Sequence, residues 1–531
     1  MTFKKKKTTE NEVFVLTLPL EPTQNQKILL DNYFRAALMI EHHLMAAELK
    51  KLKQMERTVA WKALTKNIAA SYTEVKNAKT DADAAVALAA QQELFDQRNK
   101  LLSSLGFSDA DFQTAAKKHQ HVFHSLVHSQ VVQKIASRVW KTFKDYLFSN
   151  GKAICFTPWS EFFSIAGKSN TTGLRYCASD RSLIVKKDHI RVSFHPKDKY
   201  GYETEAMKRN IRFCGIVRRW YPSGWKYFAQ ITLSGKPPLK VNPNTGEVLH
   251  ALDKGNVGND IGPQTLATVA DTAVRLSVLA ENVELPYKEI RRIQRAIDRS
   301  RRCSNPKMFN DNGEIIPINK LPPECLTPDR KHRKWAKSNN CLRLESRLRY
   351  LYQKIALQRM QSHNELTNQL LPLGDKHYIE HMNWRALAKR RKEDKFSEKG
   401  KHTSKKRFGK SIANKAPAKF VLTYRRKVEL AGGQFFEINT AKAKASQYNH
   451  MDHTYKKKKL SQRWNNLPNG DHIQRDLYSA FLIQNTNNTL DGFDNAELDS
   501  KYSKFKALHD MEIERLRHIW MPSSVGVKHA V

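Results

Sequence analysis

Three acidic residues stand where the local sequence pattern does not call for an acid. Asp260 ends one short apolar strand-like segment, Glu380 ends another, and Asp476 lies in a helical pattern over about 471–484. Carboxylate oxygens are the ligands that Mg²⁺ prefers, and two Mg²⁺ ions held by such groups activate water against a phosphodiester. Acids at strand ends also occur for ordinary structural reasons. The trio therefore predicts a catalytic two-Mg²⁺ site, provided that the fold brings the three residues together.

The net charge of the chain indicates a polyanionic partner. The 531 residues include 92 lysines and arginines against 52 aspartates and glutamates, which gives a formal net charge of +40 at pH 7. Such an excess destabilises a compact protein by self-repulsion unless a polyanion neutralises it. Nucleic acid is therefore expected as the partner, ahead of acidic lipid. The hydrophobic content of 40% excludes wholesale disorder, and the length allows about three or four domains.

Cysteine spacing and hydropathy narrow the class further. The six cysteines lie far apart without a Cys-x-x-Cys pair, so neither a disulfide framework nor a cysteine zinc site is indicated. No run approaches the roughly 18 apolar residues of a membrane span, so we expect no membrane partner and a cytoplasmic location. The basic run Lys4–Lys7 suits an arm against a phosphate backbone, a nuclear-import patch or a tail.

A predicted hairpin over 211–233 carries basic and aromatic residues near its turn. These residues are Arg218, Arg219, Trp220 and Trp225. In a nucleic-acid-binding protein they would contact phosphates and stack on bases. Cross-strand aromatic pairs also commonly do no more than hold a sheet together, and both interpretations remain open here.

Two further segments carry candidate phosphate contacts. A helix beginning near Pro286 is predicted to bury an isoleucine stripe and to present Arg291, Arg292, Arg295 and Arg299 elsewhere on its surface. The strongly basic segment 385–410 predicts a phosphate-tracking loop or a solvated one, with Lys389, Arg390 and Arg391 as contacts. Near the third acid, the candidates are Arg463, Trp464 and Arg475.

The sequence around the three acids resembles the split RuvC nuclease domain of the TnpB family. Members of this family are transposon-encoded RNA-guided DNA nucleases related to the type V CRISPR effectors. Residues 257–267 resemble the first RuvC motif, 378–383 the second and 474–481 the third, in the same order and with similar spacing. The resemblance extends to residues 167–170, 211–233, 288–302 and 408–447.

The resemblance implies an α+β multidomain fold. An RNase H-like RuvC core, a mixed sheet with helices, would be joined to a β-barrel wedge domain with an inserted helical recognition lobe. The implied domains are the first part of the wedge at 1–22, the recognition lobe at 23–150, the second part of the wedge at 151–245, the RuvC core with motifs one and two at 246–440, a degenerate zinc-ribbon-like element at 441–472, and motif three with a helical tail at 473–531. Asp260, Glu380 and Asp476 would be the catalytic residues and the Mg²⁺ ligands.

One departure from the family pattern concerns zinc. Where the family usually carries the four cysteines of a zinc ribbon, this chain has Asn449, Asp452 and the segment 467–469, so structural zinc is not expected. His450, His453 and His472, with Asp452 and Asp471, could form a substitute metal site, although histidine-rich polar loops are more often solvated.

The expected function is therefore RNA-guided cleavage of double-stranded DNA, next to a short flanking motif, by a single Mg²⁺-dependent RuvC site. A structured guide RNA and double-stranded DNA are the expected partners. Two alternatives remain. One is an RNA-guided DNA-binding transcriptional repressor with weak or absent nuclease activity, which the missing zinc ribbon favours. The other is an unguided transposase or resolvase on the same kind of fold.

Overall fold

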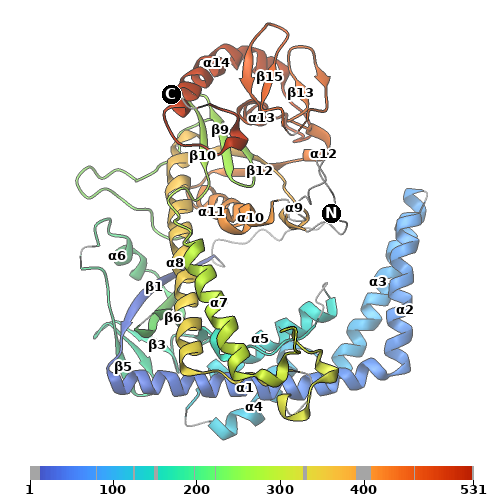
Figure 1. Cartoon of the computed structure of the whole chain (residues 1–531), viewed down its shortest axis with the longest axis vertical. Coiled ribbons are helices and arrows are strands. Elements are labelled where there is room, and N and C mark those ends of the chain that lie inside the picture. Colours follow the sequence, from blue (N-terminus) through green and yellow to red (C-terminus); the bar gives the residue numbers. More distant parts are fainter. Residues whose placement is uncertain are drawn as a thin grey trace. The chain divides into compact units, whose positions relative to one another are not determined.

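The protein is described by a computed structural model over residues 12–78, 80–123, 126–148, 153–196, 198–221, 223–326, 332–389, 408–459 and 461–528. It divides into two compact units, Met1–Pro243 and Asn244–Val531, which are shown in Figure 1. The predicted basic run Lys4–Lys7 and the predicted contacts Arg390 and Arg391 lie outside the described residues. Among the helices that are described, none is both long enough and apolar enough to cross a membrane.

The first unit begins with a strand followed by a group of helices. Thr23 starts the long first helix with a capping box, because its hydroxyl accepts from the Gln26 backbone and the Gln26 side chain accepts from the Thr23 backbone. The helices are α1 (Gln24–Arg57), α2 (Val59–Asn77), α3 (Asp81–Ser104), α4 (Asp109–Gln120), α5 (Ser129–Phe148) and α6 (Tyr202–Met207). Helices α1 and α5 share one apolar core with the sheet of this unit.

That sheet is antiparallel throughout and has the strand order β2-β6-β7-β1-β5-β4-β3. It curls into a half-barrel because β1 pairs with β7 over most of its length and with β5 at its end. The strands are β1 (Val13–Glu21), β2 (Ser164–Ala166), β3 (Arg175–Cys177), β4 (Ser182–Val185), β5 (Asp188–Val192), β6 (Ile211–Tyr221) and β7 (Gly224–Ser234). The predicted hairpin at 211–233 is confirmed as β6 and β7.

The second unit is built on a mixed five-stranded sheet with the order β10-β9-β8-β11-β12. Its strands are β8 (Asn256–Ile261), β9 (Thr265–Ala270), β10 (Ala273–Val278), β11 (Lys376–Glu380) and β12 (Gln434–Ile438). The first three form an antiparallel meander, while β11 runs parallel to both β8 and β12. The molecule is therefore of mixed α+β class, as predicted.

Helices cover both faces of this sheet. On one face, α13 (Arg475–Gln484) and α14 (Asn495–Arg517) share a core with β9 and β10. On the other face, α11 (Pro417–Leu430) and the end of α8 (Asn339–Leu370) pack on β8 and β11. The first residues of the predicted 471–484 helix are instead extended, because His472–Gln474 pairs with Trp464–Asn466 and the helix begins only at Arg475.

The remaining elements of the second unit are short, apart from one helix. Helix α7 (Tyr287–Ser304) packs along α8 through its predicted isoleucine stripe. The short elements are α9 (Trp384–Ala388), α10 (Gly409–Lys415), α12 (Thr440–Ala443) and two hairpins, β13 (Tyr448–Asn449) with β14 (Thr454–Tyr455) and β15 (Trp464–Asn466) with β16 (His472–Gln474). Single 3-10 turns lie at residues 121–123, 159–161, 306–308, 318–320, 323–325, 371–373 and 523–525.

Candidate functional site: a carboxylate cluster beside three cations

Two of the predicted acids lie at the ends of neighbouring parallel strands. Asp260 is the penultimate residue of β8, and Glu380 is the last residue of β11. The register pairs Ile379 with Asn259, so the next step along both strands sets Glu380 beside Asp260. Paired residues of parallel strands project from the same face, because side chains alternate with a period of two. Both carboxylates therefore emerge from one face at the carboxyl end of the two strands.

The third acid comes from the helix that covers this face. A Cβ atom at Gly258 would lie 2.1 Å from the backbone oxygen of Ala480, so only glycine allows α13 to approach β8 this closely. The Gln484 side chain donates to the Asn256 backbone oxygen at 3.2 Å, which shows that helix and strand run in opposite directions. One turn back from Ala480 is Asp476, which therefore lies over the strand end that carries Asp260.

The charges of the three acids interact. Burial raises the pKa of Asp260 well above its ordinary value, and the negative charges of Glu380 and Asp476 raise it further, while the charge of Arg475 opposes the shift. Burial also raises the pKa of Glu380 to about 7. The fold thus brings together carboxylates that are 120 and 96 residues apart in the sequence. A bound cation would stabilise their ionised forms.

The donor set is of the kind that suits Mg²⁺, but it is not a closed cage in this structure. Within the described ranges, no three histidine, cysteine, aspartate or glutamate side chains are gathered as a ready metal-ligand group. Oδ1 of Asp476 instead accepts from Nε and Nη2 of Arg475, at 3.1 and 3.0 Å. Hard carboxylate oxygens on a shared face nevertheless fit the oxygen preference of Mg²⁺.

Two cations interact with Asp476, namely Arg475 and Arg463, and a third, Lys458, interacts with the charge of Arg475. Arg475 also donates from Nη1 to the Gln462 backbone oxygen at 3.1 Å, and its own backbone N–H donates to the Arg463 oxygen at 2.9 Å. Burial, followed by the positive charge of Arg475, lowers the pKa of both Arg463 and Lys458. Arg463 and Arg475 were predicted from the sequence as nucleic-acid contacts, whereas Lys458 was not. The run of four lysines at 456–459 is the signal that could have found it.

Trp464 has a packing role in this structure. Its indole ring is stacked on the His472 ring, with centroids 4.7 Å apart and planes 7° from parallel, and its N–H donates to the Gly526 backbone oxygen at 2.8 Å. These contacts use one face and the only donor of the indole. They join the β15–β16 hairpin to the C-terminal segment.

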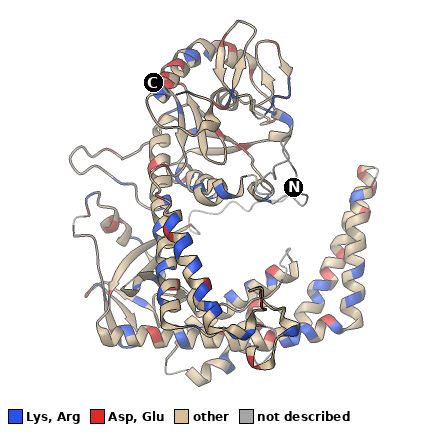
Figure 2. Cartoon of the chain, viewed as in Figure 1, with Lys and Arg blue, Asp and Glu red and all other residues tan. Residues whose placement is uncertain are grey.

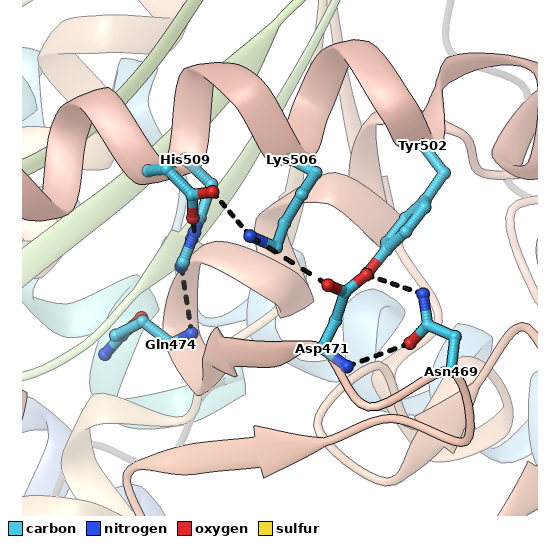
Figure 3. Close-up of polar contacts among 7 residues, drawn as sticks. Asn469, Asp471, Gln474, Tyr502, Lys506 and His509 are labelled. Carbon is cyan, nitrogen blue, oxygen red and sulfur yellow. Dashed lines mark hydrogen bonds and ion pairs between the residues drawn. The ribbon is translucent and has the colours of Figure 1, made fainter.

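Polar contacts fix that hairpin to α14, as Figure 3 shows. The Tyr502 hydroxyl donates to Asp471 at 2.7 Å, and Lys506 lies 4.0 Å from the same carboxylate. The His509 Nε2 atom accepts from the Gln474 backbone N–H at 3.0 Å. Since Gln474 is the N-cap of α13, these contacts hold the start of the helix two residues before Asp476.

The substitute metal site considered for the degenerate ribbon is not formed. Its histidines each have their own hydrogen-bond partner, since His450 bonds to Tyr478, His453 to Tyr448 and His472 to Asn466. Its acids are likewise engaged, Asp452 with Thr454 and Asp471 with Tyr502. They belong to separate side-chain contacts because the two hairpins carry them to different neighbours. The described part of the chain has no metal-ligand group that includes them.

The expected phosphate contact of Arg218 is wrong. Its side chain is fully buried and donates to the backbone oxygens of Phe162 and Trp159, each at 2.9 Å. The guanidinium carbon also lies 3.6 Å from the centre of the Trp159 ring and 4.2 Å from that of Trp225. Arg218 is therefore a core residue of the first unit, since a cation enclosed by aromatic rings and carbonyl oxygens cannot reach a phosphate.

The other hairpin residues also serve the sheet. Trp220 and Trp225 are directly opposite across β6 and β7, with ring centroids 5.1 Å apart in an edge-to-face arrangement. Arg219 lies over the Phe228 ring at 4.5 Å and remains half-exposed. The structure thus favours the sheet-holding interpretation of the two tryptophans, while Arg219 stays a candidate phosphate contact.

The arginine face of α7 is confirmed as a surface. Arg291, Arg292, Arg295 and Arg299 are exposed, on the side opposite the buried isoleucines. No ion pair is recorded for these four arginines within the described residues, whereas Arg301 pairs with Glu345 and Arg302 with Asp298. In Figure 2, lysine and arginine positions, coloured blue, recur along this helix. Lys389 is also exposed.

In comparisons with known proteins, neither a family model nor a curated protein matches the chain. A function is therefore assigned from the carboxylate cluster, the cations beside it and the sequence motifs that carry them.

Proposed function

We propose that the chain is an RNA-guided DNA endonuclease with one Mg²⁺-dependent RuvC-type site. The observation that carries the proposal is the convergence of Asp260, Glu380 and Asp476 on one face of one sheet end. A mixed sheet with helices on both faces agrees with the RNase H-like core that the sequence resemblance implies. The curled antiparallel sheet of the first unit agrees with a wedge domain in the same way.

The residues of the site have distinct tasks in this proposal. The three carboxylates hold Mg²⁺, which when bound supplies an activated water and stabilises the leaving oxygen. Arg463, Arg475 and Lys458 provide the positive charge that attracts and orients the scissile phosphate. The carboxylates must be ionised for this role, and the raised pKa of Glu380 means that a proton competes with Mg²⁺ for this carboxylate as the solution becomes acidic.

The proposed partners are nucleic acids, in agreement with the net positive charge of the chain. A structured guide RNA neutralises part of the +40 charge, and base pairing selects the double-stranded DNA target. The exposed arginines of α7 and the half-exposed Arg219 are the surfaces proposed to contact phosphates. Protein contacts would then read only the short flanking motif.

The test combines RNA sequencing with plasmid cleavage. RNA that copurifies with the chain should be a discrete structured species, and it should direct Mg²⁺-dependent cutting of a matched plasmid. Asp260→Asn, Glu380→Gln and Asp476→Asn should each reduce cutting by more than about 100-fold and spare guide-directed binding. Asp271→Asn is the matched control, because Asp271 accepts from Gln484 at the opposite end of α13. Cutting by Asp260→Asn at the normal rate contradicts the proposal.

A second candidate function is an RNA-guided DNA-binding repressor. The observation that favours it is the pairing of Asp476 with Arg475, which leaves the acids without a closed cage. A chain that binds the matched plasmid tightly without cutting it, under saturating Mg²⁺, would be this repressor.

A further inference from the structure

The contact between Arg475 and Asp476 is unusual for a helix. Adjacent helical residues point about 100° apart and do not normally face each other. Here the arginine folds over its neighbour, donates from Nε and Nη2 to the same oxygen, and reaches the Gln462 backbone with Nη1. The two side chains are only 14% and 19% exposed.

Helix stability does not account for this pair. Asp476 lies in the first turn of α13, where the helix dipole already favours a negative charge and disfavours the positive charge of Arg475. Arg463 and Lys458 add further positive charge, which interacts unfavourably with that of Arg475. The position of Arg475 is thus electrostatically unfavourable with respect to the helix dipole and the neighbouring cations, and its attraction to the carboxylate cluster offsets this.

We propose that Arg475 is a latch on the metal site. This inference rests on the proposed function and concerns the regulation of the same site. In the absence of nucleic acid, Arg475 occupies an oxygen of Asp476 that Mg²⁺ needs. An incoming phosphodiester takes over the guanidinium, because arginine binds phosphate through the same paired N–H geometry that it uses for carboxylate.

The latch couples two binding events. Nucleic acid that engages Arg475 frees Asp476 for the metal, and a metal that engages Asp476 frees Arg475 for nucleic acid. Coupling of this kind is reciprocal, so each ligand raises the affinity for the other by the same factor. The site is therefore complete only when a strand is present, which limits metal-dependent cutting in its absence.

The first test measures Mn²⁺ affinity by electron paramagnetic resonance on the full chain stripped of nucleic acid. Hydrogen bonds to charged groups are strong enough that Arg475→Gln should bind Mn²⁺ about tenfold more tightly than the wild type. Arg463→Gln is the matched control, because it removes an equal charge that interacts with Asp476 from nearby, whereas no hydrogen bond or ion pair joins the two side chains among the described residues. It should change the affinity less than about threefold. Equal effects of the two variants, or none from Arg475→Gln, overturn the latch.

A variant of the metal site separates this inference from the proposed function. Asp260→Asn should abolish the site-specific Mn²⁺ binding. Unchanged binding in Asp260→Asn means that the proposed metal site is wrong, and the latch falls with it. Loss of binding in Asp260→Asn together with wild-type affinity in Arg475→Gln means that only the latch is wrong.

The second test approaches the latch from the nucleic-acid side, with EDTA present and a short single-stranded DNA as the probe. Asp476→Asn releases Arg475 and should tighten DNA binding by about tenfold. Asp260→Asn makes the same kind of substitution at a neighbouring acid without releasing Arg475 and should have a smaller effect. The gain should disappear in the double variant Arg475→Gln/Asp476→Asn. A gain that persists in the double variant, or that Asp260→Asn matches, overturns the inference even if one variant folds poorly.

Discussion

Gly258 is the position where one added methyl group tests the geometry of the site. In Gly258→Ala the new Cβ atom would lie 2.1 Å from the Ala480 oxygen and 2.2 Å from the Gln484 nitrogen, both backbone atoms of α13. Neither can rotate away, so the helix must retreat by more than about 1 Å before contact returns to roughly 3.5 Å. Asp476 moves with the helix, away from Asp260 on the strand.

Two consequences are expected from this displacement. Overpacking should destabilise the second unit by about 1 to 3 kcal/mol. A misplacement of about 1 Å in the site should lower the cleavage rate by about 100-fold. Chemical denaturation measures the first effect, and plasmid cleavage with the copurified guide RNA measures the second.

Gly262→Ala is the matched control. Gly262 lies just after the same strand, and its added Cβ would meet nothing closer than the Thr265 hydroxyl at 3.4 Å. It should leave both stability and cleavage close to those of the wild type. If Gly258→Ala behaves like Gly262→Ala, then α13 does not hold Asp476 over β8 as described, and the argument from close approach fails.

Further predictions concern buried charges, acid stability and the surface of α7. The buried Glu512 accepts from the Leu276 backbone and from Arg275 and Arg515, so Glu512→Ala should destabilise the second unit by about 3 to 5 kcal/mol in chemical denaturation. Burial lowers the pKa of both His363 and His377 to about 4, against 6.5 ordinarily, so both are neutral when folded and gain protons on unfolding. With respect to these two histidines, the folded state has its full stability above pH 6.5 and loses stability as the pH falls towards 4. At pH 5.5 each histidine should lower the free energy of unfolding by about 1 kcal/mol relative to pH 7.5. An unfolding free energy that does not change between pH 7.5 and 5.5 would contradict this prediction. Arg218→Leu leaves two backbone oxygens without donors and should destabilise the first unit by about 3 kcal/mol, without changing the salt dependence of DNA binding. Arg295→Gln should do the reverse, leaving the melting temperature unchanged and lowering the slope of log affinity against log salt by about 1.

The secondary structure around the acids follows closely from local pattern. The apolar runs that end at Asp260 and Glu380 form strands because their residues pack on both faces, and Thr23 caps α1 through the side-chain chemistry that its sequence neighbours supply. The isoleucine spacing in α7 likewise fixes which face is buried, and hence that Arg295 is exposed. The start of α13 was predicted about four residues too early, because pairing with β15 extends His472–Gln474.

Side-chain roles that depend on distant neighbours did not follow from pattern. Arg218 alternates correctly on its strand, but nothing local shows that Trp159, from 59 residues earlier, closes over its guanidinium. In the same way, the sequence shows a run of four lysines at 456–459. Only the packing of the hairpins shows that one of them, Lys458, lies close enough to Arg475 for their charges to interact.

The sequence alone determined the net positive charge, the mixed strand and helix content, and the identity of the three acids. These depend on composition and on residue periodicity, which are local quantities. Only the tertiary structure decided that Asp476 faces Asp260, since this depends on the direction of α13 across β8 and on the missing side chain of Gly258. The contact between Arg475 and Asp476 also depends on the tertiary structure, because the partner of a long flexible side chain is set by the charged groups that the fold brings within its reach.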